Sequence, residues 1–276
     1  MKTKILFSSL FVIAITAGLF PGCIKDAVNN QKVSYADRNS IFAQQTFDQE
    51  EGQIDFTLLT PGTTKSTKDG SASVSGCLTV TLDWLETPTT MTLDFGATNC
   101  HCADGNYRRG KMLVTFNGPL TDSLTIVSLT FENYFVNENQ VIGTRTITNK
   151  GHNAAGHINY DITTNGSIVL ADNGGTITYH SNHNREWTEG ENNLMMGDDV
   201  YSFTGSSSGT TIEGQTFAIA ITTPLVWKMS CNHFVSGVIE LKPDGEAKRV
   251  IDYGTGECDN IATVTVLGYS FQITLG

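Results

Sequence analysis

Four carboxylates lie close to a tryptophan between residues 185 and 199. The carboxylates are Glu186, Glu189, Asp198 and Asp199, and the tryptophan is Trp187. An aromatic ring offers a platform for a sugar, carboxylates accept hydrogen bonds from its hydroxyls, and two carboxylates at a set separation hydrolyse glycosidic bonds. The spacing along the chain sets no such separation. We therefore expect residues 185–199 to form a long loop that is either only solvated or contacts a glycan, and a glycan-active hydrolase that uses these carboxylates is the alternative.

Some histidine, cysteine and aspartate spacings invite comparison with metal sites. His180 and His183 are three residues apart, and such residues in a strand face opposite sides. Cys100 and Cys102 would place both sulfurs on one face of an extended segment, but no second ligand pair follows with the spacing of a zinc site. Residues 252–260 are acidic without the residue order of an EF-hand, so an irregular calcium loop is the alternative there. We expect no metal site and no cofactor.

Two short motifs match catalytic signatures without the context that these signatures require. Residues 205–209 fit the G-x-S-x-G nucleophile elbow, but the next residues alternate like a strand, whereas the elbow precedes a helix. Asp94-Phe95-Gly96 spells the metal-binding tripeptide of protein kinases, yet no glycine-rich loop or catalytic loop accompanies it. We expect a hairpin turn and a strand end at these positions. The sequence thus favours a domain without catalytic residues over an enzyme.

The cysteines form part of an internal repeat. They are Cys23, Cys77, Cys100, Cys102, Cys231 and Cys258. Segments 77–100 and 231–258 share a cysteine, two candidate strands, Asp-aromatic-Gly, three residues and a second cysteine, and another strand follows each. This similarity indicates an internal duplication with its copies at opposite ends of the domain. It predicts the disulfides Cys77–Cys100 and Cys231–Cys258 with Cys102 free, and a Cys77–Cys102 bridge with Cys100 free is the alternative.

Alternating side chains place most of these residues on strands. Residues 127–131, 158–162 and 216–222 alternate between large apolar and small or polar side chains, as strands with one buried face do. Turn-forming pairs such as Asn165-Gly166 separate about fifteen candidate strands. The pattern predicts an all-β fold of many hairpins, which is an antiparallel meander or sandwich, or a partly closed barrel. Threonine, serine and asparagine on the alternate positions predict one solvated face.

The composition excludes several classes of protein. Of the 276 residues, 39% are hydrophobic and 16% are charged, which suits a folded domain rather than a disordered chain. The formal net charge of −11 repels phosphate groups, so we expect neither a nucleic acid partner nor electrostatic attraction to a membrane. Any attachment to a bilayer therefore requires an anchor.

The first residues have the pattern of an export signal. Lys2 and Lys4 precede an apolar run at residues 5–20, which is shorter than the ~20 residues of a membrane-spanning helix. Gly22 and Cys23 follow this run. The region resembles the signal of bacterial lipoproteins, in which a small residue precedes a cysteine that receives a diacylglyceryl group. The resemblance implies cleavage after residue 22 and fatty acylation, with palmitate or a similar chain, of Cys23.

Lys25 and Asp26 lie just after this cysteine. A lysine and an acid at this place resemble the surface-export signal of Bacteroidota-type lipoproteins. The resemblance implies a protein of the outer membrane that acyl chains anchor at the cell surface, and the periplasmic face of the membrane is the alternative. Two or more acyl chains hold a protein in a bilayer without help from charge.

The polar residues after the anchor predict a flexible tether. Turn-forming residues such as Thr60-Pro61-Gly62 interrupt residues 23–72, where a short helix at 37–49 and a strand at 54–59 are the expected local exceptions. The chain then divides into a signal peptide (1–22), a lipid-anchored flexible tether (23–72) and an all-β domain (73–276). We expect an exported lipoprotein whose β domain binds a glycan or an envelope protein, or supports the envelope, without catalysis.

Overall fold

Antiparallel strands make up most of the described chain. The computed structural model describes residues 34–59, 71–75, 78–83, 87–102, 104–193, 195–231 and 233–275. The strands are β1 (Ser71–Ser75), β2 (Leu78–Asp83), β3 (Thr89–Asp94), β4 (Cys100–His101), β5 (Tyr107–Phe116), β6 (Ile126–Val136), β7 (Asn139–His152), β8 (Ile158–Val169), β9 (Thr176–Glu189), β10 (Val200–Thr210), β11 (Thr216–Lys228), β12 (Phe234–Pro243), β13 (Arg249–Thr255), β14 (Ile261–Val266) and β15 (Tyr269–Thr274). The helices are α2 (Tyr35–Leu59) and two short 3-10 turns, η1 (Ala171–Asn173) and η2 (Met196–Asp198).

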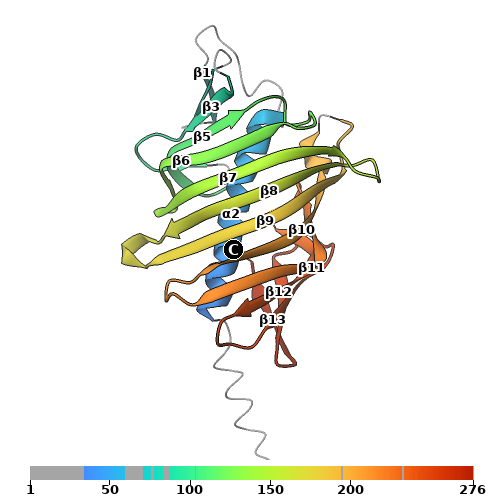
Figure 1. Ribbon diagram of the computed structural model, residues 1–276. Coiled ribbons are helices and arrows are strands. Elements are labelled where there is room, and N and C mark those ends of the chain that lie inside the picture. Colours follow the sequence, from blue (N-terminus) through green and yellow to red (C-terminus); the bar gives the residue numbers. More distant parts are fainter. Residues whose placement is uncertain are drawn as a thin grey trace, which may run out of the picture. The chain divides into compact units, whose positions relative to one another are not determined.

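Strands that follow one another in sequence also lie side by side in the sheet. The order is β1-β2-β3-β5-β6-β7-β8-β9-β10-β11-β12-β13-β14-β15, and β4 pairs with β5 outside this path. Every pair of strands is antiparallel. The predicted antiparallel meander is therefore confirmed. Among the described strands, β1 and β15 are the two edges of a sheet that curls without closing into a barrel (Figure 1).

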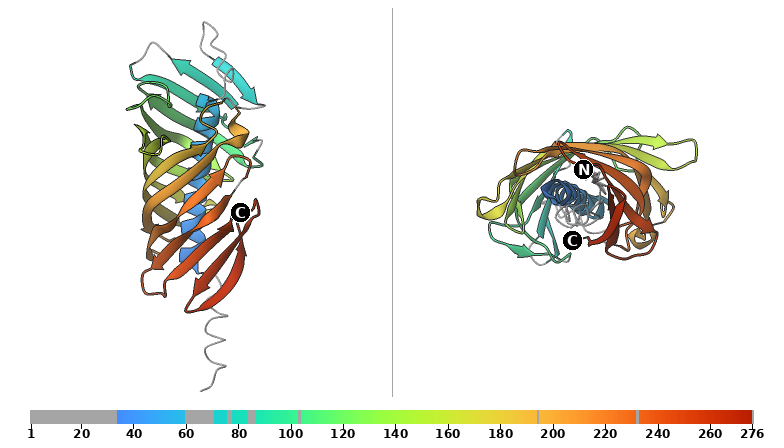
Figure 2. Two further views of the ribbon diagram at one scale, coloured as in Figure 1. Left: turned by 90° about the vertical axis from the view of Figure 1, so that its right-hand side faces the viewer. Right: turned by 90° about the horizontal axis from the view of Figure 1, so that it is seen from below.

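Helix α2 lies inside the curl of the sheet. The view along the helix shows strands around most of its circumference (Figure 2), and side chains such as Phe47 and Ile54 are fully buried. This position contradicts the flexible tether expected for residues 23–72, because residues 35–59 belong to the same compact unit as the sheet. The strand expected at residues 54–59 is also wrong, since these residues are the last part of the helix.

Local interactions define where α2 begins and ends. The Asp37 amide donates to Ser34 Oγ at 3.3 Å and the Ser34 amide donates to Asp37 Oδ2 at 2.8 Å, which is a capping box. Pro61 follows the helix closely and cannot continue it. Many polar side chains of the helix are buried, so no apolar stripe reveals it in the sequence. They are Asp37, Asn39, Ser40, Gln44, Thr46, Glu50, Glu51 and Thr57.

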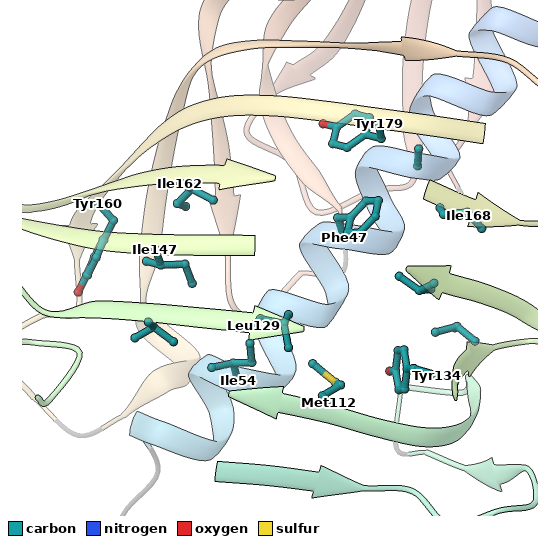
Figure 3. Packing of buried hydrophobic residues seen from close by; sticks show 14 of the residues in the cluster. Phe47, Ile54, Met112, Leu129, Tyr134, Ile147, Tyr160, Ile162, Ile168 and Tyr179 are labelled. Carbon is teal, nitrogen blue, oxygen red and sulfur yellow. The ribbon is translucent and has the colours of Figure 1, made fainter. Parts of the chain in front are cut away.

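Apolar side chains of α2 and of the inner face of the sheet form the core (Figure 3). Phe47 stacks on Tyr179 of β9, with ring centroids 5.7 Å apart and ring planes 13° from parallel. Gly166 of β8 provides the space for this ring, because a Cβ atom there would clash with Phe47 Cζ and would lie 2.8 Å from the Ile142 carbonyl oxygen. A larger residue at position 166 would therefore have to shift the Phe47 ring or the backbone of β7.

The two copies of the sequence repeat have the same local structure. The Gly96 amide donates to Asp94 Oδ1 at 2.8 Å, and the Gly254 amide donates to Asp252 Oδ1 at 2.9 Å. Both glycines have positive φ angles, +83° and +95°, which glycine adopts without strain. The aromatic residue between aspartate and glycine is buried in both copies. The copies occupy β2 to β5 and β12 to β14, near opposite edges of the sheet.

The cysteines largely follow the repeat. Cys231 and Cys258 form the predicted disulfide, with Cα atoms 5.7 Å apart. Cys100 is also disulfide-bonded, whereas Cys102 is free and half-buried. The alternative with a free Cys100 is therefore wrong. Cys77, the expected partner of Cys100, lies outside the described residues.

Candidate functional site

The segment predicted to contact a glycan is divided between a strand and a connection. Residues up to Glu189 belong to β9, and only residues 190–199 lead to β10. Successive side chains of a strand alternate between its faces. Trp187 points inward, is 6% exposed and packs on Tyr201, with ring centroids 5.5 Å apart. Glu186 points outward, so Trp187 and Glu186 do not contribute to one surface.

Glu186 connects the turn between β7 and β8 to β9. Its carboxylate accepts a hydrogen bond from Asn153 Nδ2 at 2.8 Å, and His157 Nδ1 lies 2.6 Å from the same oxygen. The hydrogen bonds from Asn153 and His157 lower the pKa of Glu186. A second pair, His152 Nε2 and Glu191 Oε1 at 2.7 Å, connects the end of β7 to the β9–β10 connection. These contacts hold neighbouring hairpins together at one end of the sheet.

The other predicted carboxylates do not form a common site with Glu186. Glu189 is exposed at the end of β9. Asp198 accepts a hydrogen bond from Asn193 Nδ2 at 3.1 Å, and buried Asp199 accepts one from the Tyr201 hydroxyl at 3.4 Å. In the described part of the chain, no three His, Cys, Asp or Glu side chains are grouped as metal ligands would be. This arrangement does not favour the hydrolase alternative for residues 185–199.

Buried ion pairs between α2 and the sheet are the main feature that sequence reasoning missed. Four inward-facing arginines, each on a different strand, meet four acids of the helix. The contacts are Arg249 Nε to Asp37 Oδ1 at 3.0 Å, Arg145 Nη2 to Asp48 Oδ1 at 3.1 Å, Arg185 Nη1 to Glu51 Oε1 at 2.6 Å, Arg108 Nη2 to Glu50 Oε1 at 3.4 Å, and Arg145 to Glu51. The helix is therefore attached to β5, β7, β9 and β13 by charge.

Glu50 lies in the most elaborate of these contacts. The Tyr134 hydroxyl donates to Glu50 and accepts a hydrogen bond from Arg108 Nε at 3.0 Å. Asp104 Oδ2 lies 2.7 Å from Arg108 Nη2 and adds a second carboxylate. Burial raises the pKa of Glu50 although the Arg108 guanidinium opposes this effect. Burial likewise raises the pKa of Tyr134, which keeps its hydroxyl protonated as a donor.

The two acids that face Arg145, Asp48 and Glu51, have pKa values that are shifted in opposite directions. Burial raises the pKa of Asp48 to about 6, although Arg145 acts in the opposite direction. Burial also acts to raise the pKa of Glu51, but Arg145 and Arg185 together outweigh it and lower this pKa. Burial, with Arg145 nearby, lowers the pKa of His183 to about 4. At neutral pH two arginines therefore face two carboxylates beside an uncharged imidazole.

These ion pairs define the position of the helix. The cost of removing two charges from water offsets much of their attraction, but removal of one partner leaves a buried charge and costs about 3–5 kcal/mol. Helix α2 is therefore held in the register that gives each acid an arginine. The sequence does contain a signal, since Arg145 and Arg249 occupy the apolar phase of their strands, two residues before buried Ile147 and Ile251.

A small cleft lies between α2 and the C-terminal strands. Helix residues Ile41, Gln44, Gln45, Asp48 and Gln49 line one side, and Trp227, His233, Phe234, Tyr253 and Leu275 line the other. Phe234 packs edge-on against Trp227 and Tyr253, with ring centroids 5.2 and 5.6 Å away. The open space is about that needed by a single water molecule. The cleft is thus too small for a sugar.

The outer face of β7 to β10 carries rows of hydroxyl, amide and imidazole groups. Pairing in the sheet aligns Thr144, Asn165, His180 and Ser208 in one row, and Thr146, Thr163, Asn182 and Ser206 in the next. Side chains in such rows are about 5 Å apart between strands and about 7 Å apart along a strand. The Thr163 hydroxyl donates to Asn182 Oδ1 at 3.2 Å. The predicted solvated face of threonine, serine and asparagine is therefore confirmed, and neither row contains an acidic, lysine or arginine side chain.

Within the described residues, no helix combines the length and apolar character needed to cross a bilayer. No known protein family, curated protein or solved structure matches the chain. The assignment of a function therefore depends on the chemistry and geometry of these surfaces.

Proposed function

We propose that this chain is an exported lipoprotein, acylated on Cys23, whose sheet binds a neutral glycan through its outer face without catalysis. The observation that carries this proposal is the field of hydroxyl and amide groups on β7 to β10. Such groups donate and accept the hydrogen bonds that sugar hydroxyls make. The net charge of −11 disfavours an anionic polymer. An envelope protein with an uncharged polar surface is the other class of partner.

The disulfides support export from the cytoplasm. The Cys231–Cys258 bridge and the bonded Cys100 are typical of proteins in oxidising compartments. Because the acidic chain has no electrostatic attraction to a membrane, acyl chains on Cys23 supply the anchor. In this proposal Lys25 and Asp26 direct the protein to the cell surface, and the periplasmic face of the outer membrane is the alternative.

The connection between the lipid and the folded domain is short in this proposal. Helix α2 begins at Tyr35, so only residues 24–34 separate it from Cys23. A fully extended chain of this length reaches at most about 40 Å. The acylated cysteine would therefore hold the sheet close to the bilayer, and α2 is the described element nearest to it along the chain.

Replacement of Cys23 with serine tests the anchor. We expect the Cys23→Ser chain to lose labelling by a palmitate analogue and to leave the membrane fraction, whereas the Cys102→Ser chain keeps both properties. Protease accessibility in intact cells then compares the native chain with a Lys25→Ala/Asp26→Ala variant, which should lose surface display. If the Cys23→Ser chain still partitions with membranes and its precursor is trimmed as before, the anchor is assigned wrongly.

Added charge on the outer face tests the binding. Immobilised neutral polysaccharides serve as probes for the full chain in nonionic detergent. We expect Thr163→Glu and Asn182→Asp to weaken binding about tenfold or more, because each would bury a charge without a partner beneath the glycan. Thr121→Glu, in an exposed turn, is the matched control and should bind as the native chain does. Binding that survives both outer-face changes, or a native chain that binds no probe, would contradict the proposal.

A further inference from the structure

The last strand of the sheet has one unoccupied edge among the described residues. Strand β15 pairs with β14 on one side, and no described strand pairs with its other side. The N–H and C=O groups on that side therefore point away from the sheet, where another strand can pair with them. Figure 2 shows β14 and β15 in red at this end of the sheet.

Strand β15 itself carries no charged side chain, proline or bulge that would block pairing. Charged side chains, proline and bulges usually protect an edge strand. Residues 261–276 contain no charged residue and no proline. The register between β14 and β15 is continuous from Ile261 opposite Thr274 to Val266 opposite Tyr269, without a bulge. Among the described residues, β15 is thus a regular edge strand without these protective features.

The apolar inner face of the sheet continues onto β15 and remains incompletely covered there. Tyr269, Phe271 and Ile273 lie opposite Val266, Val264 and Ala262, which are buried. Phe271 and Ile273 pack only partly against the core, and Tyr269 is 42% exposed. Leu267, in the turn that precedes the strand, is 66% exposed. Apolar surface therefore gathers at the same edge that has unoccupied backbone groups.

We infer that β15 pairs with β15 of a second copy of this chain, antiparallel across a two-fold axis. Two chains of net charge −11 repel each other, so a contact between them is most favourable where the surface has no acids, and β15 contains none. A two-fold axis perpendicular to the sheet keeps both apolar rows on the same face. With Phe271 opposite its own copy, Tyr269 lies opposite Ile273, and both are favourable cross-strand pairs. This contact is the same patch on both copies and closes as a dimer.

The association state of the full chain tests this inference. Sedimentation equilibrium in density-matched nonionic detergent should show a dimer for the native chain. Ser270→Lys/Gln272→Lys should weaken association about tenfold or more, because the register places each lysine opposite a lysine of the other copy. Both positions are exposed, so the fold should persist, as circular dichroism can verify. Asn182→Lys on β9 is the matched control and should leave the dimer intact.

Cysteine cross-linking in intact cells then tests the register, in a Cys102→Ser background. Co-expressed Ser270→Cys and Gln272→Cys chains should form a disulfide-linked dimer, whereas each variant alone should form much less. A cross-link between Ser270→Cys and Ser73→Cys of β1 would instead indicate an open chain of copies and overturn the two-fold contact. A native chain that stays monomeric, or lysine variants that associate like the native chain, would overturn the inference altogether.

Discussion

The two faces of the sheet place charge in opposite ways. On the inner face, arginines of β5, β7, β9 and β13 meet the acids of α2. On the outer face of β7 to β10, the two central rows consist of hydroxyl, amide and imidazole groups. The same strands produce both faces: Thr163 points outward, and Thr164 points inward in register with Arg145.

This difference indicates the role of the four buried arginines. The chain has 17 lysines and arginines against 28 acids, and it uses four arginines to hold a polar helix inside the sheet. Because these guanidinium groups are buried in ion pairs, they are structural and do not attract an anionic ligand. The two central rows of the outer face are left without charged side chains, although Lys150 and Asp161 form an exposed ion pair beside them. These uncharged rows are what the proposed binding of a neutral glycan needs.

The largest expected effect comes from breaking the inner network. Arg145→Met leaves Asp48 and Glu51 with one guanidinium fewer, and we expect the free energy of unfolding to fall by about 3–5 kcal/mol. Arg109→Met is the control, because its partner Glu138 is on the surface, and it should leave stability nearly unchanged. Urea unfolding of both variants measures the difference. Similar losses in the two variants would show that the inner pairs have no special role.

Removal of the Cys231–Cys258 disulfide should lower the free energy of unfolding by the next largest amount. We expect Cys231→Ser/Cys258→Ser to lose about 3 kcal/mol, because the bridge closes a loop with a sequence separation of 27. The Cys102→Ser variant removes only a free thiol and should unfold like the native chain. Unfolding under non-reducing conditions measures both. A double variant as stable as Cys102→Ser would contradict the expectation.

The free energy of unfolding, measured over a series of pH values, tests how Asp48 behaves on the inner face of the sheet. Its pKa in the folded state is raised to about 6 from an ordinary value of 3.8, so the folded chain binds the proton more tightly than the unfolded chain. Stability contributed by this group therefore falls as pH rises from about 4 to about 7, through the folded-state pKa, and is constant above that range. Relative to Asp48→Asn, the native chain should lose about 2 kcal/mol across this window. A constant difference between the two chains from pH 4 to 7 would contradict the raised pKa.

The smallest effect compares two adjacent threonines. Thr164 is buried on the inner face, and its hydroxyl makes no hydrogen bond within the described chain. We expect Thr164→Val to raise the free energy of unfolding by about 1 kcal/mol, because an unsatisfied buried hydroxyl is removed. Thr163→Val on the solvated face should change it little. Chemical denaturation measures the free energy of unfolding of both variants. An equal change in Thr164→Val and Thr163→Val would argue against the assigned faces.

The sequence predicted those features that depend on local pattern. Alternation of side chains gave the antiparallel meander, and the repeat around Asp94 and Asp252 predicted the Cys231–Cys258 bridge. The turns expected at Asn165-Gly166 and at residues 205–209 were wrong, because these residues lie within β8 and β10. The short helix expected at residues 37–49 covers only part of α2, and its place inside the sheet was not recognisable, because its burial depends on arginines far away in the sequence. Arg145, for example, is separated from Glu51 by 94 residues. Polar residues that look like a solvated tether become interior residues only once those partners are in place.

The inward position of Trp187 was missed for a related reason. A tryptophan beside Glu186 and Glu189 is typical of a sugar site, but strand alternation decides which of them reaches solvent. The phase of β9 could be determined from Ile177 and Tyr179, which are buried and lie on the same face as Trp187. The outer face was predictable as a solvated surface, but its alignment into rows required the register of the strands.

Hydrogen exchange of the full chain, followed by mass spectrometry, tests the central claim most directly. If arginines of the sheet hold α2 inside it, amides of residues 35–59 should exchange as slowly as those of β7 to β9, and Arg145→Met should accelerate them. Exchange of residues 35–59 within seconds in the native chain, while β7 to β9 stay protected, would show a tether outside the sheet and contradict this account.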